Sequence, residues 1–168
     1  MGIEMTKKIY IAGPLFSEAE LEFNKKVDVF LRRIGLDTFL PQRDGYLLAD
    51  LMLQGASKEK ALDIIFNKDL EQIKNCDLVL LILDGRVPDE GACVEVGLAY
   101  AYDKECVGFK SDSRSLMGNM DNPLLVGALK GRVARSFSEL ESFLEDFLGK
   151  NLSQFSCRSA SVCSEKAM

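Results

Sequence analysis

The chain of 168 residues contains no histidine and no tryptophan, only four prolines, and no apolar run long enough to cross a bilayer. The missing histidine excludes a serine or cysteine nucleophile activated by an imidazole, and it excludes a histidine-rich zinc site. Acid–base chemistry must therefore come from carboxylates, tyrosines, lysines or cysteines. A membrane-spanning helix needs about 20 apolar residues, and the N-terminus lacks a signal-peptide core, so we expect no membrane partner.

Cysteine is present five times, an odd number, without a C-x-x-C pair. Cys76, Cys93 and Cys106 lie in or beside expected strands and helices, where a free thiol behaves as a small hydrophobe. This usage predicts a reducing, cytoplasmic compartment. The net charge of −5, with both signs mixed along the chain, argues against nucleic acid as a partner.

Short apolar segments alternate with amphipathic helical patterns along most of the chain. Strands are expected near residues 7–14, 38–40, 78–83, 105–109 and 132–134. Strands that alternate with helices form a parallel sheet with helices on both faces. We therefore predict the α/β class and a flavodoxin-like three-layer sandwich, with a five-stranded parallel sheet of order 2-1-3-4-5. Residues 1–150 are expected to form this domain, and the Ser-rich residues 151–168 a disordered tail.

The segment after the expected third strand is acidic and contains glycine, and it leads into a helix. In open parallel sheets, ligands bind at the carboxyl ends of the strands. Asp89 and Glu95 are six residues apart, about 240° around a helix at ~100° per residue. They share a pocket if Asp89 lies in the loop or caps the helix. Small neighbours such as Gly91 leave room for a substrate above Glu95. A solvated glutamate on an ordinary helix is the alternative.

Two polar residues occupy positions where apolar ones are expected. The helix expected over residues 57–75 has a predicted buried stripe of Leu62, Ile65, Phe66, Leu70 and Ile73. Asp69 falls within this stripe, where a carboxylate is costly unless it is paired or lines a wet cavity. We favour a functional role over a helix-edge aspartate that reaches solvent. Tyr10 lies in the first strand and can point its hydroxyl at Glu95, although a core tyrosine is the alternative.

Two loops are weaker candidates for ligand binding. Gly13 follows the first strand in a Gly-Pro loop that lacks both G-x-G-x-x-G and the lysine of a phosphate-binding loop. Gly13 is expected to supply a permissive turn beside a ligand. After the fourth strand, Ser111, Ser113 and Arg114 form a candidate anion-binding loop.

Four motifs in register resemble the nucleoside 2-deoxyribosyltransferase family. They are Lys8–Pro14, the segment from Asn67 to Asp77, Pro88–Gly91 and Glu95–Gly97. The resemblance spans roughly residues 7–148. It implies exchange of the base on a 2'-deoxyribonucleoside with retention at the anomeric carbon, and it implies no metal or organic cofactor. The implied substrates are a 2'-deoxyribonucleoside and a free purine or pyrimidine base. A homo-oligomer with a shared active site is also implied.

Three residues take catalytic roles from their positions in these motifs. Glu95 corresponds to the nucleophilic glutamate of the family, and Tyr10 to the tyrosine that orients it. Asp69 corresponds to an aspartate near the nucleobase that is linked to proton transfer. Retention needs two displacements, so a carboxylate must attack C1' and form a glycosyl ester. This chemistry requires an ionised Glu95 and a protonated Asp69 of raised pKa.

Substrate-binding roles follow from the same resemblance. Asp89 corresponds to the aspartate that binds the sugar 5'-hydroxyl. Asn122 best matches an asparagine that also binds this hydroxyl, usually from a neighbouring subunit, and Asn119 competes for that assignment. Gln42, after the second strand, is a predicted base contact.

Two other functions stay open at this point. A related family hydrolyses 2'-deoxynucleoside 5'-phosphates and tends to carry a serine where this chain has Asp89. A carboxylate within ~4 Å of a phosphate is repelled by about 4 kcal/mol at an effective dielectric of ~20, so we expect nucleosides to be preferred. The third reading is a non-catalytic flavodoxin-like module that binds a nucleoside.

Overall fold

The computed structural model describes residues 6–114 and 121–148, which include five strands and seven helices. In chain order these are β1 (Lys8–Ala12), α1 (Glu18–Arg33), β2 (Asp37–Phe39), α2 (Pro41–Asp44), α3 (Leu48–Leu53), α4 (Lys58–Asn75), β3 (Leu78–Ile82), α5 (Glu90–Ala101), β4 (Glu105–Phe109), α6 (Pro123–Ala128), β5 (Val133–Ala134) and α7 (Phe137–Leu148). The expected tail at residues 151–168 and the competing Asn119 lie outside the described residues.

The five strands form one parallel sheet of order β2-β1-β3-β4-β5, which confirms the predicted topology. β1 lies between β2 and β3, and Tyr10 stands opposite Phe39 on one side and Val79 on the other. All strands point the same way, so their carboxyl ends meet at one edge of the sheet. That edge carries the loops after β1, β2, β3 and β4.

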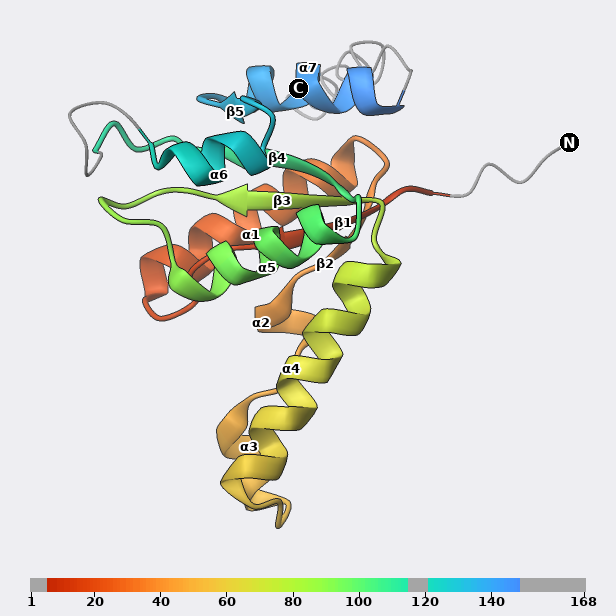
Figure 1. Ribbon diagram of the computed structural model, residues 1–168, viewed down its shortest axis with the longest axis vertical. Coiled ribbons are helices and arrows are strands. Elements are labelled where there is room, and N and C mark those ends of the chain that lie inside the picture. Colours follow the sequence, from red (N-terminus) through yellow and green to blue (C-terminus); the bar gives the residue numbers. More distant parts are fainter. Residues whose placement is uncertain (1–5, 115–120, 149–168) are drawn as a thin grey trace, which may run out of the picture.

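Helices cover both faces of the sheet (Figure 1). On one face, Ile9 and Ile11 of β1 pack against apolar residues of α1 and α7. On the other face, Tyr10 and Ala12 pack against α4, α5 and α6, with Val96 among their neighbours. The alternation along β1 is the period of two that a strand imposes. It directs Tyr10 toward the α5 face.

Local sequence signals place the helix ends that matter for the site. Ser17 caps α1 and forms a capping box with Glu20. Ser57 caps α4. Asp89 is the N-cap of α5, with its Oδ2 accepting from the Ala92 amide at 2.9 Å. This cap puts the start of α5 at the carboxyl edge of the sheet, directly after β3.

The predicted buried stripe of α4 is wrong in its first half. Leu62 is 48% exposed and Phe66 is 54% exposed, whereas Ile73 is buried. In Figure 1, α3 and the first turns of α4 extend away from the sheet as an arm, and α3 packs against α4. The first half of α4 therefore packs on the short helix α3, whereas Ile73 in its last turns reaches the core.

Cys76 and Cys106 are buried and free, as expected of core thiols, whereas Cys93 is free but only half-buried. Within residues 6–114 and 121–148, no helix has the length and apolar character needed to cross a membrane.

Candidate active site

The candidate site is built around a hydrogen bond between β1 and α5. The Tyr10 hydroxyl donates to Oε1 of Glu95 at 2.5 Å, as the sequence predicts. Tyr10 itself is fully buried, and its ring stacks on Phe39 with the centroids 5.2 Å apart. Burial raises the pKa of Tyr10 far above its usual range, and the Glu95 charge adds to this. The phenol therefore stays a neutral donor, which aims one oxygen of Glu95 in a fixed direction.

Glu95 is less acidic than an ordinary glutamate. Burial raises its pKa to about 8, and the charges of Asp69 and Asp89 act in the same direction. The hydrogen bond from Tyr10 lowers the pKa but does not offset the burial. Burial therefore works against the ionised form of Glu95 that the expected chemistry requires, because desolvation outweighs the single donor.

Asp69 lies on α4 close enough for its charge to raise the pKa of both Glu95 and Tyr10. Its side chain is half-buried, and burial raises its own pKa to about 6, while Lys68 lowers it. Asp69, the polar residue within the predicted apolar stripe of α4, therefore lies on the side of the helix that faces Glu95 and Tyr10. A carboxyl group with a pKa near the working pH is suited to proton transfer.

Asp89 is the N-cap of α5, the helix that carries Glu95. One of its oxygens caps the helix, and Oδ1 has no partner within the described part of the chain. Gly91 belongs to the same turn, and an added Cβ there would lie 3.1 Å from Oδ2 of Asp89. Any side chain at Gly91 would therefore crowd the Asp89 carboxylate. The open space expected above Glu95 stays a prediction.

Gly13 does not serve as a permissive turn, because its φ angle lies outside the left-handed region that only glycine adopts readily. What requires glycine there is a close approach. An added Cβ would lie 3.1 Å from Cβ of Ile82, at the end of β3. The absence of a side chain lets the ends of β1 and β3 come together at the carboxyl edge of the sheet.

Gln42 lies in α2, immediately after the carboxyl end of β2. Its Oε1 accepts from the Asn24 amide at 3.0 Å, and its Nε2 donates to the Leu21 carbonyl at 3.0 Å. Asn24 was not identified from the sequence, although it interrupts the apolar stripe of α1 three residues after Leu21. The same signal that pointed to Asp69 could have found it.

Asn122 is exposed and is the N-cap of α6, with its Oδ1 accepting from the Leu124 amide at 2.9 Å. None of its described contacts joins it to the Tyr10–Glu95 pair. Its predicted role toward a substrate in a neighbouring subunit stays a prediction.

The candidate anion-binding loop is already neutralised. The Arg114 guanidinium pairs with Asp112 at 2.5 Å, and the Ser111 hydroxyl donates to Asp84 at 2.6 Å. The Ser111 amide also donates to Asp84. Among the described residues, Ser111 and Arg114 are therefore already engaged by two carboxylates, Asp84 in the loop after β3 and Asp112 in their own loop.

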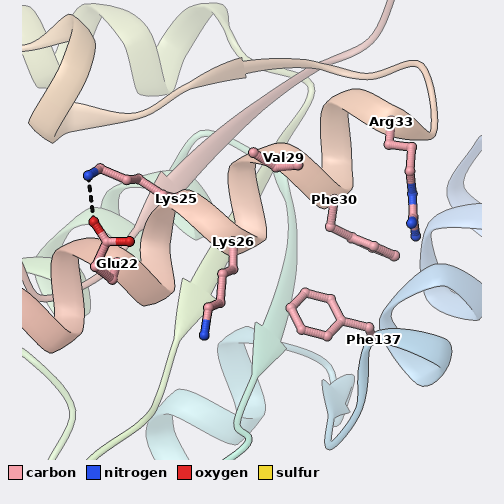
Figure 2. Close-up of a pocket in the computed structure, with 7 residues that line it drawn as sticks. All are labelled: Glu22, Lys25, Lys26, Val29, Phe30, Arg33 and Phe137. Carbon is pink, nitrogen blue, oxygen red and sulfur yellow. Dashed lines mark hydrogen bonds and ion pairs between the residues drawn. The ribbon is translucent and has the colours of Figure 1, made fainter.

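A separate groove on the outer face of α1 contains none of these residues. Figure 2 shows it, with a volume of about 480 Å³, an apolar floor that includes Phe30 and Phe137, and Lys26 and Arg33 at its rim. Its one carboxylate, Glu22, is paired with Lys25.

In the described parts of the chain, no group of three or more metal-ligating side chains lies close enough together to hold a metal ion.

Comparisons with known proteins agree with the family resemblance seen in the sequence motifs. A family model for nucleoside 2-deoxyribosyltransferase matches residues 9–152. No curated protein matches the sequence. Among solved structures, the 2-deoxyribosyltransferase of Bacillus psychrosaccharolyticus is 26% identical, with a TM-score of 0.66 over 80% of this chain and 90% of that one.

Two further solved structures share the fold. A conserved protein of Enterococcus faecalis V583 is 26% identical, with a TM-score of 0.67 over 92% of this chain and 99% of that one. The CMP N-glycosidase BcmB of Clostridium botulinum is 18% identical, with a TM-score of 0.52 over 84% of this chain and 99% of that one. At this identity the likeness concerns the fold alone.

Proposed function

Because the chain belongs to the nucleoside 2-deoxyribosyltransferase family, we propose that it transfers 2-deoxyribose between nucleobases through a covalent ester on Glu95. The observation that carries the proposal is the 2.5 Å hydrogen bond that aims a carboxylate on α5 from a buried tyrosine on β1. The substrates are a 2'-deoxyribonucleoside and a free purine or pyrimidine base. Two displacements at C1' give retention, as they do in retaining glycosidases.

In the first displacement, a Glu95 carboxylate oxygen bonds to C1' while the bond from C1' to the base nitrogen breaks. The bonding electrons leave with the base, and Asp69 gives its proton to a base nitrogen. In the second displacement, the nitrogen of another base bonds to C1' and the ester bond breaks, so the electrons return to Glu95. Asp69 then accepts the proton that the incoming base loses.

The two raised pKa values set how the proton is shared. Between about pH 6 and pH 8, Asp69 and Glu95 together hold one proton, and the productive arrangement has it on Asp69. Positive charge that develops on the sugar favours the ionised form of Glu95 in the transition state. We therefore expect kcat/KM to rise through about pH 6 and to fall through about pH 8.

Asp89 and Gln42 bind the two ends of the nucleoside in this proposal. The unpartnered oxygen of Asp89 accepts a hydrogen bond from the 5'-hydroxyl, and Gln42 contacts the base. Asn122 of a neighbouring subunit adds a second contact to the same hydroxyl, which makes the enzyme a homo-oligomer with a shared site.

Incubation with thymidine and free adenine tests the proposed activity. We expect deoxyadenosine and thymine to form in equal amounts, measured by liquid chromatography. Thymidine and deoxyguanosine are both used as donors, with adenine and cytosine as acceptors, so that a base preference does not hide the activity. Release of base without any new nucleoside, or no reaction in all four combinations, would contradict the transferase.

Replacing Tyr10 with phenylalanine is expected to lower kcat/KM by roughly 10- to 100-fold, since a hydrogen bond to a charged group contributes about 1.5–3 kcal/mol. The same loss raises the pKa of Glu95, because Tyr10 is the group that lowers it. The falling limb of the pH profile should therefore move above pH 8. Tyr100→Phe, an exposed tyrosine on α5, is the control. An unmoved limb in Tyr10→Phe would contradict the role of this hydrogen bond.

Asp89 distinguishes nucleosides from their 5'-phosphates. We expect thymidine to react with a kcat/KM at least about tenfold above that of thymidine 5'-phosphate, because the carboxylate repels the phosphate. In Asp89→Ser, which removes the charge, the ratio should fall and base release from the phosphate should increase. A 5'-phosphate that reacts faster than its nucleoside in the unaltered protein would favour a hydrolase of 2'-deoxynucleoside 5'-phosphates instead.

A further inference from the structure

One buried amide joins two of the loops at the carboxyl edge of the sheet. Asn24, on α1, is 1% exposed. Its Nδ2 donates to the Pro14 carbonyl at 2.8 Å, in the loop after β1. The same nitrogen donates to Oε1 of Gln42 at 3.0 Å, just after β2. Both hydrogens of the Asn24 amide are therefore used to hold segments that border the proposed site.

These contacts determine which way the Gln42 amide faces. Its Oε1 accepts from Asn24, and its Nε2 donates to the Leu21 carbonyl at 3.0 Å. A half-turn of the amide would set Nε2 against the Asn24 nitrogen and Oε1 against the Leu21 oxygen, and both contacts would be repulsive. An amide oxygen has two lone pairs and an amide nitrogen two hydrogens. In this fixed orientation Gln42 keeps one acceptor site and one donor hydrogen for a ligand.

The orientation of Asn24 is kept at a cost. Its Oδ1 is buried and has no hydrogen-bond partner among the described residues. This oxygen faces Gly13, where an added Cβ would lie 3.4 Å away. A buried acceptor without a partner is unfavourable, so stability alone does not account for a polar side chain at this position. A role in the site accounts for it.

We propose that Asn24 is a positioning residue that sets the preference between amino and oxo nucleobases by fixing the Gln42 amide. The inference rests on the proposed function and on Gln42 as the base contact. Adenine and cytosine present an N–H donor beside a ring nitrogen acceptor, whereas hypoxanthine and uracil present a carbonyl acceptor beside a ring N–H. For a base bound in a given pose, a Gln42 amide held in one orientation pairs with only one of these two arrangements of donor and acceptor. An amide free to turn would pair with either arrangement.

The test is a competition between two acceptor bases in one reaction. Adenine and hypoxanthine, or cytosine and uracil, are mixed with a 2'-deoxyribonucleoside donor, and the ratio of the two products gives the ratio of kcat/KM. This ratio does not depend on how much protein is folded. We expect the unaltered protein to prefer one base of each pair. In Asn24→Leu, which removes the Nδ2 donor, the ratio should move toward one by about three- to tenfold. In Asn24→Asp, whose carboxylate favours a Gln42 amide turned to present Nε2, the ratio should move in the same direction, to one or past it.

Gln72→Ala is the matched control, because Gln72 is also a buried amide but lies at the amino end of the sheet, where it accepts from Lys8 at 2.8 Å. It should leave the ratio unchanged even if it lowers the melting temperature. In a Gln42→Ala background, Asn24→Leu should have no further effect on the ratio.

Three results would contradict the inference while leaving the proposed function in place. They are an unaltered protein that does not discriminate within either pair, an Asn24 variant that is active with an unchanged ratio, and a shift of equal size in Gln72→Ala. Absence of base exchange in the unaltered protein would instead remove the proposed function, and this inference with it.

Discussion

Replacing Glu95 with alanine is expected to lower the rate of base exchange by at least about 10⁴-fold, because the proposed double displacement requires the Glu95 carboxylate to form the covalent ester. The protein should still fold. Glu95 is a half-buried carboxyl whose ionised form is destabilised by burial, so its loss removes an unfavourable group as well as a hydrogen bond. The measurements are kcat for exchange and the thermal unfolding transition.

Glu90→Ala is the control for this prediction, since Glu90 is an exposed glutamate in the first turn of the same helix. It should retain exchange within about twofold, as surface substitutions usually have small effects. If Glu95→Ala kept exchange at a rate near that of Glu90→Ala, Glu95 would be excluded as the nucleophile. If the unaltered protein bound deoxynucleosides and catalysed nothing, the non-catalytic module would be the correct interpretation.

Asp69→Asn is expected to lower kcat by roughly 10²- to 10⁴-fold, the range for loss of a general acid. The amide keeps the size of the side chain but cannot give up a proton to the leaving base. The loss should depend on the leaving group. With 7-methyl-2'-deoxyguanosine as the donor, the base already carries a positive charge and leaves without a proton, so the first displacement should be slowed less than about tenfold.

Asp63→Asn, an exposed aspartate on the same helix, controls for loss of charge on α4. Asp69→Asn should also remove the falling limb of kcat/KM near pH 8, because no acid is left to lose its proton. A single rising limb should remain, set by the ionisation of Glu95, whose pKa is lower in this variant because the charge of Asp69 no longer raises it. A variant equally slow with ordinary and methylated donors would show that Asp69 does not act as the acid.

The sheet and the Tyr10–Glu95 pair were predictable because they depend on short-range patterns and on topology. Once β1 and β3 are neighbours, the alternation along β1 directs Tyr10 to the α5 face, and the Asp89 cap places Glu95 two turns into the helix. The hydrogen bond between Tyr10 and Glu95 follows from these two constraints.

The errors arise where tertiary context decides. Periodicity predicted a buried stripe for all of α4, but Leu62 and Phe66 lie on an arm that leaves the sheet, and no local pattern indicates where a helix leaves its core. Gly13 was predicted to supply a turn, whereas glycine is required there because Ile82, 69 positions away, leaves too little room for a side chain. The ionisation of Glu95 depends on burial, which sequence spacing does not reveal. Asn24 is a polar residue on an apolar stripe and could have been found.

Mass spectrometry of the acid-quenched protein tests the covalent intermediate most directly. After mixing with thymidine in the absence of an acceptor base, the peptide that contains Glu95 should carry one 2-deoxyribosyl group, and addition of adenine should remove that group and yield deoxyadenosine. The Glu95→Ala protein should carry no such group. Base exchange that proceeds without any adduct, or with the adduct on a different residue, would contradict the proposed double displacement at Glu95.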